Sequence, residues 1–206
     1  MAIGTAGYTA MLCVMELERM GVQPGDREVI VTGAGGGVGS VAIAVLAKLG
    51  FRVAASTGRP QLAEYLTGLG ASSIIDRGEL REASGRPLDA ERWAGAVDSV
   101  GGQTLASVLS GTCYGGTVTA CGLAGGADLP TSVLPFILRN VNLIGVDSVV
   151  CPGPTRQLAW NRLSEDLAHE PLESMTVVEP MSRILELAPQ ILAGQIRGRV
   201  VIDVNA

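Results

Sequence analysis

The chain has 206 residues, enough for one large domain or for one domain with a fragment of another. Hydrophobic residues make up 47% and charged residues 17%, which excludes a disordered chain, and a net charge of −5 argues against nucleic-acid or polybasic membrane-surface binding. With 28 glycines and 3% aromatic residues, the composition favours an α/β protein over an all-β sandwich.

Short β-branched runs alternate along the chain with glycine turns and helical segments. Such alternation requires a parallel sheet with helices on both faces, and six runs predict a doubly wound sheet of the Rossmann type. The predicted strands are 28–31, 52–55, 73–75, 94–98, 116–121 and 142–146, with a further strand at 198–204. The predicted helices are 40–49, 60–69, 103–109, 155–167 and 181–193, and residues 77–92 are predicted as loop plus surface helix.

These elements divide the chain into three predicted parts. Residues 1–25 form a lead-in helix and turn, residues 26–180 form the dinucleotide-binding domain, and residues 181–206 form a C-terminal helix and strand. The uncharged stretches 29–47 and 99–127 are interrupted by glycines, so we expect no membrane span.

The cysteines bear on both compartment and metal binding. Cys13, Cys113, Cys121 and Cys151 form no C-x-x-C pair, and His169 is the single histidine of the sequence. A zinc site needs clustered ligands, so we expect no metal. Reduced core thiols in a cytoplasmic protein are the favoured interpretation over a disulfide framework.

A glycine-rich turn at residues 32–39 joins the first strand to the first helix. The strict G-x-G-x-x-G pattern does not fit, because Ala34 occupies its first position, whereas Gly33, Gly36 and Gly39 fit a G-x-x-G-x-x-G spacing. A diphosphate needs backbone N–H groups without an intervening Cβ, and the helix N-terminus attracts the anion. The turn therefore indicates a dinucleotide site, and a tight turn without a ligand is the alternative.

The end of the second strand indicates which nucleotide binds. NAD-binding versions of this fold place a carboxylate there for the ribose hydroxyls, but this chain has Ser56, Thr57, Gly58 and Arg59 instead. An arginine suits a 2′-phosphate, and Arg77 after the third strand is expected to approach it too. We therefore expect NADPH rather than NADH; the alternative for both arginines is a solvated surface role.

Several motifs resemble a known family. They are residues 2–11, 35–39, 57–59, 69–71, 114–116, 120–126, 135–141 and 145–148. Together they resemble the zinc-free medium-chain dehydrogenase/reductase superfamily, and within it the acryloyl-CoA reductase branch, which is often described as quinone oxidoreductase-like. The resemblance covers essentially the whole chain. Stretches 121–124 and 135–140 point to the branch, whereas the glycine turn points only to the superfamily.

The resemblance implies two lobes, of which this chain is the nucleotide-binding one. A GroES-like lobe of roughly a hundred residues, an ordinary domain size, would precede residue 1, and the terminal segments would belong to that mostly absent lobe. The resemblance also implies the cofactor contacts. The diphosphate would be bound by Gly35, Gly36, Gly37 and Val38, and the 2′-phosphate by Thr57, Gly58, Arg59 and Arg77. Leu123 would lie beneath the path from the adenosine to the nicotinamide, and Ile137 and Ser148 would approach the nicotinamide side. For Leu123 and Ile137, plain core packing is the alternative.

The implied activity is NADPH-dependent reduction of an activated C=C bond, as in an acryloyl-CoA-like enoyl thioester, or of a quinone. No proton donor is identified, and no Tyr-x-x-x-Lys motif occurs, which disfavours a short-chain dehydrogenase. A stand-alone NADP-binding module without catalysis is the alternative. We expect a homodimer formed through the apolar edge strand 142–146.

Overall fold

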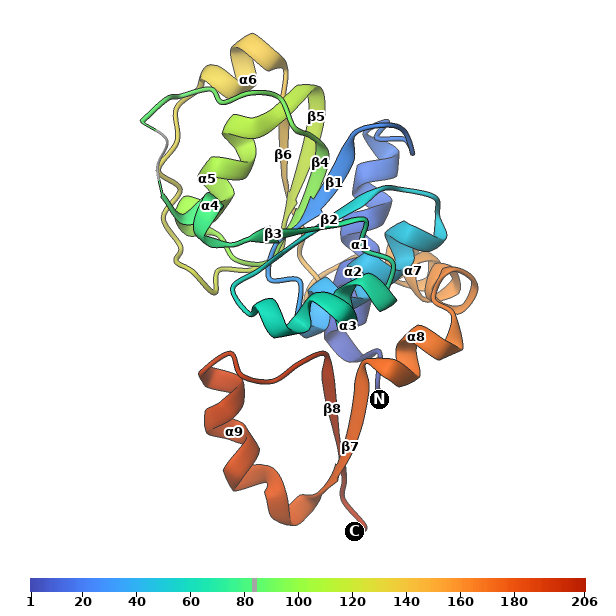
Figure 1. Ribbon diagram of the computed structural model, residues 1–206. Helices are drawn as coiled ribbons and strands as arrows, with labels where there is room; N and C mark the ends of the chain where they lie inside the picture. Colours follow the sequence, from blue (N-terminus) through green and yellow to red (C-terminus); the bar gives the residue numbers. More distant parts are fainter. Residues whose placement is uncertain (83–84) are drawn as a thin grey trace.

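The computed structural model describes residues 1–82 and 85–206. Its main body is a parallel six-stranded sheet in the order β3-β2-β1-β4-β5-β6, which confirms the predicted doubly wound fold (Figure 1). The strands are β1 Glu28–Val31, β2 Val53–Thr57, β3 Ser73–Asp76, β4 Trp93–Asp98, β5 Thr112–Ala120 and β6 Asn142–Gly145.

Strand β1 lies at the centre of the sheet and shows why these runs form buried strands. Val29, Ile30 and Val31 are all fully buried, because a parallel sheet is covered on both faces and so needs apolar residues in succession. Val29 and Val31 belong to one hydrophobic cluster and Ile30 to another. The alternation places the two clusters on opposite faces of the sheet.

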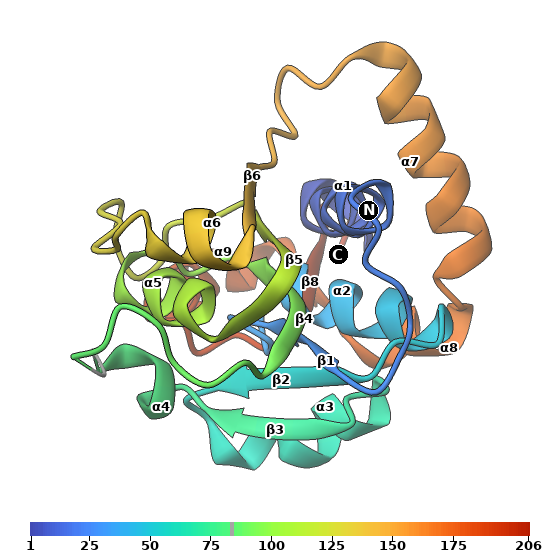
Figure 2. The same cartoon turned by 90° about the horizontal axis from the view of Figure 1, so that it is seen from above.

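Helices cover each face. One cluster joins α1, α2, α3 and α7, and the other joins α4, α5 and α6 to the opposite face. Figure 2 shows α1, α2 and α7 together, apart from α5 and α6. The bounds are α1 Gly4–Arg19, α2 Gly37–Lys48, a 3-10 turn Pro60–Leu62, α3 Ala63–Gly68, α4 Gly78–Arg81, α5 Gly102–Gly111, α6 Leu134–Arg139 and α7 Gly153–Asp166.

A second, two-stranded parallel sheet lies at the lower end of the molecule in Figure 1. It pairs β7 (Thr176–Pro180) with β8 (Arg199–Asp203). Helix α8 (His169–Ser174) precedes it, and a 3-10 turn (Met181–Arg183) and α9 (Ile184–Leu192) connect its strands. Strand β8 was predicted, whereas β7, α6 and α8 were not. The predicted domain limits at residues 25 and 180 stay predictions.

No helix among the described residues is both long and apolar enough to cross a membrane.

Candidate functional site

A cleft of about 680 Å³ lies beyond the carboxyl ends of β1, β2 and β4. The strand order reverses between β1 and β4, and ligands of open α/β sheets bind at such a reversal. Three segments far apart in the sequence form most of its wall: residues 32–37, residues 56–59 with Arg77 and Arg81, and residues 191–200.

The glycine turn is shaped by backbone contacts that leave no space for side chains. Gly33 has a φ of 61°, in the left-handed region, and its carbonyl accepts a hydrogen bond of 2.9 Å from Gly36 N. A Cβ on Gly39 would lie 2.5 Å from the Gly33 carbonyl oxygen and 2.6 Å from Ala34 Cα. Only glycine at residue 39 therefore lets α2 begin directly above the turn.

Asp98, at the end of β4, fixes the start of the glycine turn through a hydrogen bond with Thr32. It is fully buried, and its carboxylate accepts hydrogen bonds from Thr32 Oγ1 at 2.6 Å and from Gly101 N at 2.8 Å. Burial raises the pKa of Asp98, and the hydrogen bond from Thr32 acts in the opposite direction. Because Thr32 follows β1 and Asp98 ends β4, this hydrogen bond connects the two strands at their carboxyl ends, beside the cleft. Sequence analysis did not single it out.

A basic corner is formed by Arg59, Arg77 and Arg81 beside the turn. The side chain of Arg77 lies against Gly58, in the space that a Cβ there would fill. Burial lowers the pKa of Arg59, and the positive charge of Arg77 lowers it further. None of the described residues that line this cleft is acidic. A chain with a net charge of −5 thus concentrates positive charge at one place, as an anion site requires.

The Arg59 guanidinium points along the cleft wall towards the C-terminal segment. Its Nη1 donates hydrogen bonds to the carbonyls of Gln195 at 2.9 Å and Ile196 at 3.2 Å. Its Nη2 donates to the carbonyls of Gly35 at 3.3 Å and Ile196 at 3.2 Å. Gly198 N also donates to the Gly35 carbonyl, at 3.0 Å. These bonds dock residues 195–198 onto the glycine turn.

Arg199 places a further cation at the start of α2. A Cβ on Gly37 would lie 2.8 Å from Arg199 Nη1, so this guanidinium lies directly beside the first residue of the helix. Its Nε donates to the Ala2 carbonyl at 2.9 Å, and burial lowers its pKa. Arg199 and Arg81 were not predicted from the sequence, because neither belongs to a motif near the turn.

The predicted cofactor contacts divide into those that line this cleft and those that do not. The structure brings seven of them to this cleft: Gly35, Gly36, Gly37, Thr57, Gly58, Arg59 and Arg77. Val38 is half-buried in the first turn of α2 and does not line the cleft.

Leu123 lines a second cleft, of about 530 Å³, at the carboxyl ends of β5 and β6. Asp147 also lines that cleft, and Ser148 follows it. Ile137 is not brought to either cleft: it is 67% exposed on α6, which leads into the start of β6 at the far end of the sheet (Figure 1).

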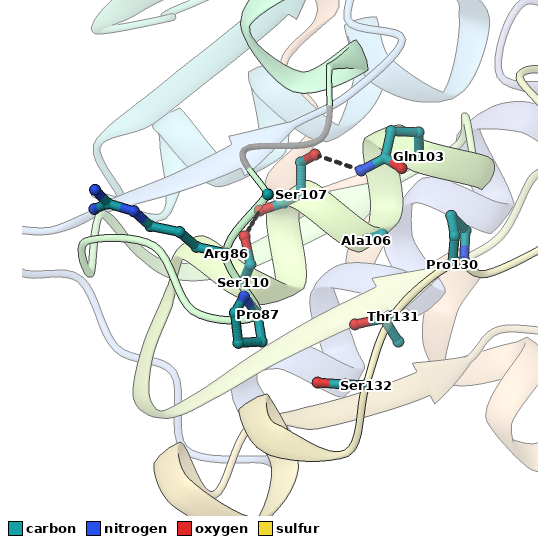
Figure 3. A pocket seen from close by; sticks show the side chains of 10 residues that line it. Arg86, Pro87, Gln103, Ala106, Ser107, Ser110, Pro130, Thr131 and Ser132 are labelled. Atoms are coloured by element: carbon teal, nitrogen blue, oxygen red, sulfur yellow. Dashed lines mark hydrogen bonds between the residues drawn. The ribbon is translucent and has the colours of Figure 1, made fainter.

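Figure 3 shows a third pocket, of about 170 Å³, which shares no lining residue with the two clefts. Gln103 Nε2 donates to Ser107 Oγ at 3.2 Å, and Ser110 Oγ donates to the Ser107 carbonyl at 2.9 Å. Ser110 Oγ also lies 2.6 Å from Asp89 Oδ2, and this pocket is smaller than either cleft.

No group of three or more His, Cys, Asp or Glu side chains within residues 1–82 and 85–206 could hold a metal ion.

Known proteins resemble the chain over its whole length. Residues 37–165 match the model of a family described as zinc-binding dehydrogenase. The acrylyl-CoA reductase AcuI of Ruegeria pomeroyi is 56% identical over 206 residues, which is 100% of this chain and 62% of that protein. Escherichia coli K-12 YhdH, solved with bound NADPH, superimposes with a TM-score of 0.96 at 53% identity, covering 100% of this chain and 63% of that one. Bacillus subtilis YhfP, solved with bound NAD, gives a TM-score of 0.94 at 44% identity, covering 99% and 62%. The chain thus spans less than two thirds of the length of these relatives.

Proposed function

Since this chain belongs to the zinc-binding dehydrogenase family, we propose that it forms the nucleotide-binding part of an NADPH-dependent oxidoreductase. The proposed substrate is an activated C=C bond, in an enoyl thioester of the acryloyl-CoA kind, or a quinone. The observation that carries the proposal is the basic corner beside the glycine turn, in a cleft whose described lining residues include no acidic side chain. The acrylyl-CoA reductase AcuI and the NADPH-bound YhdH support it as relatives.

The cleft fits a phosphorylated dinucleotide in shape and charge. A Cβ on Gly35 would lie 2.7 Å from Arg59 Nη2, and one on Gly37 would lie 3.1 Å from Arg199 Cδ, so the bare backbone lets both arginine side chains lie directly against the turn that a diphosphate would approach. The N-terminus of α2 and Arg199 supply positive charge there. The basic corner supplies it at the end of β2, where the 2′-phosphate would lie.

The chain's own residues hold and orient the cofactor in this proposal. Asp98 and Thr32 fix the turn, and the second cleft beside Leu123 provides a partly apolar space next to the nicotinamide side. When bound, the nicotinamide supplies a hydride for an electron-poor carbon. Exclusion of water and close positioning are then the protein's contributions to the rate.

We also propose that two copies associate through β6. It is one of the two edge strands of the main sheet in the described part of the chain, and an edge strand offers unpaired backbone groups to a second copy. A cytoplasmic location fits four cysteines that are all free thiols.

A fluorescence titration of the 206-residue chain with NADPH and NADH tests the proposed function. We expect NADPH to bind at least about tenfold more tightly, the worth of one charge-assisted hydrogen bond. Equal affinities, or no binding of either, would refute the cofactor assignment. Turnover assays with acryloyl-CoA and with a quinone separate the substrate classes, and tight NADPH binding without turnover would support a binding module instead.

A further inference from the structure

Tyr65, on α3, is linked to the glycine turn by two hydrogen bonds, although the proposed function has so far given it no role. Its hydroxyl donates to Ser40 Oγ at 2.8 Å, and Ser40 Oγ donates to the Ala34 carbonyl at 3.3 Å. Ser40 is fully buried near the start of α2. The phenol of Tyr65 therefore reaches the turn through a side chain that is itself fixed by the core.

Gly198, in the C-terminal segment, lies against the same hydroxyl. A Cβ at residue 198 would lie 2.9 Å from Tyr65 Oη, and the φ of Gly198 is 57°, in the left-handed region. Only glycine lets the backbone approach the phenol this closely. The Gly198 N–H donates to the Gly35 carbonyl at 3.0 Å. The backbone that leads into Arg199 is thus held between the glycine turn and Tyr65.

The aromatic ring of Tyr65 contacts the residue before Gly198. Arg197 Cζ lies 4.5 Å from the centroid of the ring, which is a cation–π distance. Burial raises the pKa of Tyr65, so its hydroxyl stays protonated and remains a hydrogen-bond donor at neutral pH. One side chain therefore supports residues 197 and 198 and, through Ser40, the glycine turn.

We propose that Tyr65 is a positioning residue for the diphosphate of the cofactor, because its hydroxyl aligns the glycine turn with the segment that carries Arg199. This inference rests on the proposed function. Tyr65 does not line the cleft, so it acts through Ser40 and Gly198 and not by contact with the cofactor. Arg199 lies beside Gly37 at the start of α2, where the diphosphate would bind. NADPH and NADH share that diphosphate, so loss of the hydroxyl should weaken both by the same factor.

The first experiment measures dissociation constants of the Tyr65→Phe variant of the 206-residue chain. The ligands are NADPH, NADH and the 2′-phosphorylated adenosine monophosphate, which lacks the diphosphate. Phenylalanine keeps the ring against Arg197 and removes only the hydroxyl. We expect both dinucleotides to bind about three- to tenfold more weakly, the worth of one hydrogen bond, and the monophosphate to stay within about twofold. A loss of stability alone would not separate the dinucleotides from the monophosphate.

Tyr114→Phe is the matched control. Tyr114 lies in β5, is 70% exposed and lines neither cleft. The substitution removes the same hydroxyl from a tyrosine outside the site. All three dissociation constants should stay within about twofold of those of the unchanged chain.

Ser40→Ala tests whether Tyr65 acts through Ser40. When two side chains share one hydrogen bond, their effects are not additive. The double variant Tyr65→Phe with Ser40→Ala should therefore weaken NADPH by clearly less than the product of the two single factors. A loss equal to that product would overturn the path through Ser40.

A second measurement needs no cofactor. Hydrogen exchange followed by mass spectrometry should show faster exchange in residues 195–200 of Tyr65→Phe than in the unchanged chain, because the backbone of Gly198 loses its support. Exchange there should be unchanged in Tyr114→Phe. Unchanged exchange in Tyr65→Phe would overturn the positioning of the C-terminal segment.

The titrations separate the inference from the function on which it rests. Unchanged affinity of Tyr65→Phe for NADPH, or an equal loss for all three ligands, would overturn the inference and leave the proposed function standing. Failure of the unchanged chain to bind either dinucleotide would overturn the proposed function itself.

Discussion

Gly39→Ala tests whether the glycine turn is shaped by backbone contact with α2. A Cβ at residue 39 would lie 2.5 Å from the Gly33 carbonyl oxygen, 2.6 Å from Ala34 Cα and 2.8 Å from the Ala34 carbonyl oxygen. Since non-bonded atoms settle at about 3.5–4.0 Å, the turn must move by roughly 1 Å. Overpacking of this kind costs about 1–3 kcal/mol, and the better helix propensity of alanine offsets about 0.5–1 kcal/mol.

We therefore expect Gly39→Ala to lower the free energy of unfolding by about 1–2 kcal/mol and to weaken both NADPH and NADH. Urea unfolding followed by circular dichroism measures the first effect, and fluorescence titration measures the second.

Gly68→Ala is the control, because Gly68 also lies in a helix and a Cβ there meets nothing within 4 Å. It should raise the free energy of unfolding by up to about 1 kcal/mol. Equal stability of the two variants would refute the backbone-contact argument.

Three further outcomes follow from contacts described or measured in the structure. Asp98→Asn should lower the free energy of unfolding by about 1–3 kcal/mol at neutral pH, because an amide cannot accept both the Thr32 hydroxyl and a backbone N–H. Burial raises the pKa of Asp98 above 3.8, so protonation favours the folded state, and the stability difference between the unchanged chain and this variant should grow as pH falls towards 3.8 in urea titrations. Arg162→Ala removes an ion pair of 2.9 Å to Glu18 between α7 and α1 and should cost about 1 kcal/mol, less at high salt. Gly145→Pro removes an outward N–H of the edge strand β6, so, if two copies associate through β6 as proposed, light scattering should show a dimer for the unchanged chain and a monomer for this variant.

The sheet was predictable because its signals are local. The central strands β1, β2 and β4 are short runs that are buried at nearly every residue, because helices cover both faces of the sheet. The resemblance to medium-chain dehydrogenase/reductases, stated on the motifs, is confirmed by the family match over residues 37–165.

The elements missed are those whose stability comes from distant partners. Among the described residues, strand β7 pairs only with β8, and its Val178 is 64% exposed, so β7 lacks the buried pattern of a strand in the main sheet. Helix α6 spans only Leu134–Arg139, too short for a helical period to be visible. It ends at Asn140, whose φ of 49° lies in the left-handed region.

The candidate site divides in the same way. The glycine turn and Arg59 could each be predicted from a short stretch of sequence, and both line the same cleft in the structure. Arg199 reaches the turn only because β7 and β8 pair, which no local pattern indicates. Ile137 was assigned on the resemblance alone, and the path of α6 carries it to the other end of the sheet.

The docking of residues 195–198 on the glycine turn has a consequence for biosynthesis. Chains fold from the N-terminus as they leave the ribosome, and all six strands of the main sheet are complete by residue 145. The opposite wall of the cleft emerges only some fifty residues later. A nascent chain thus completes the strands of its main sheet before the last part of the cleft wall is synthesised, so we expect loading of the proposed cofactor to be a late event in maturation.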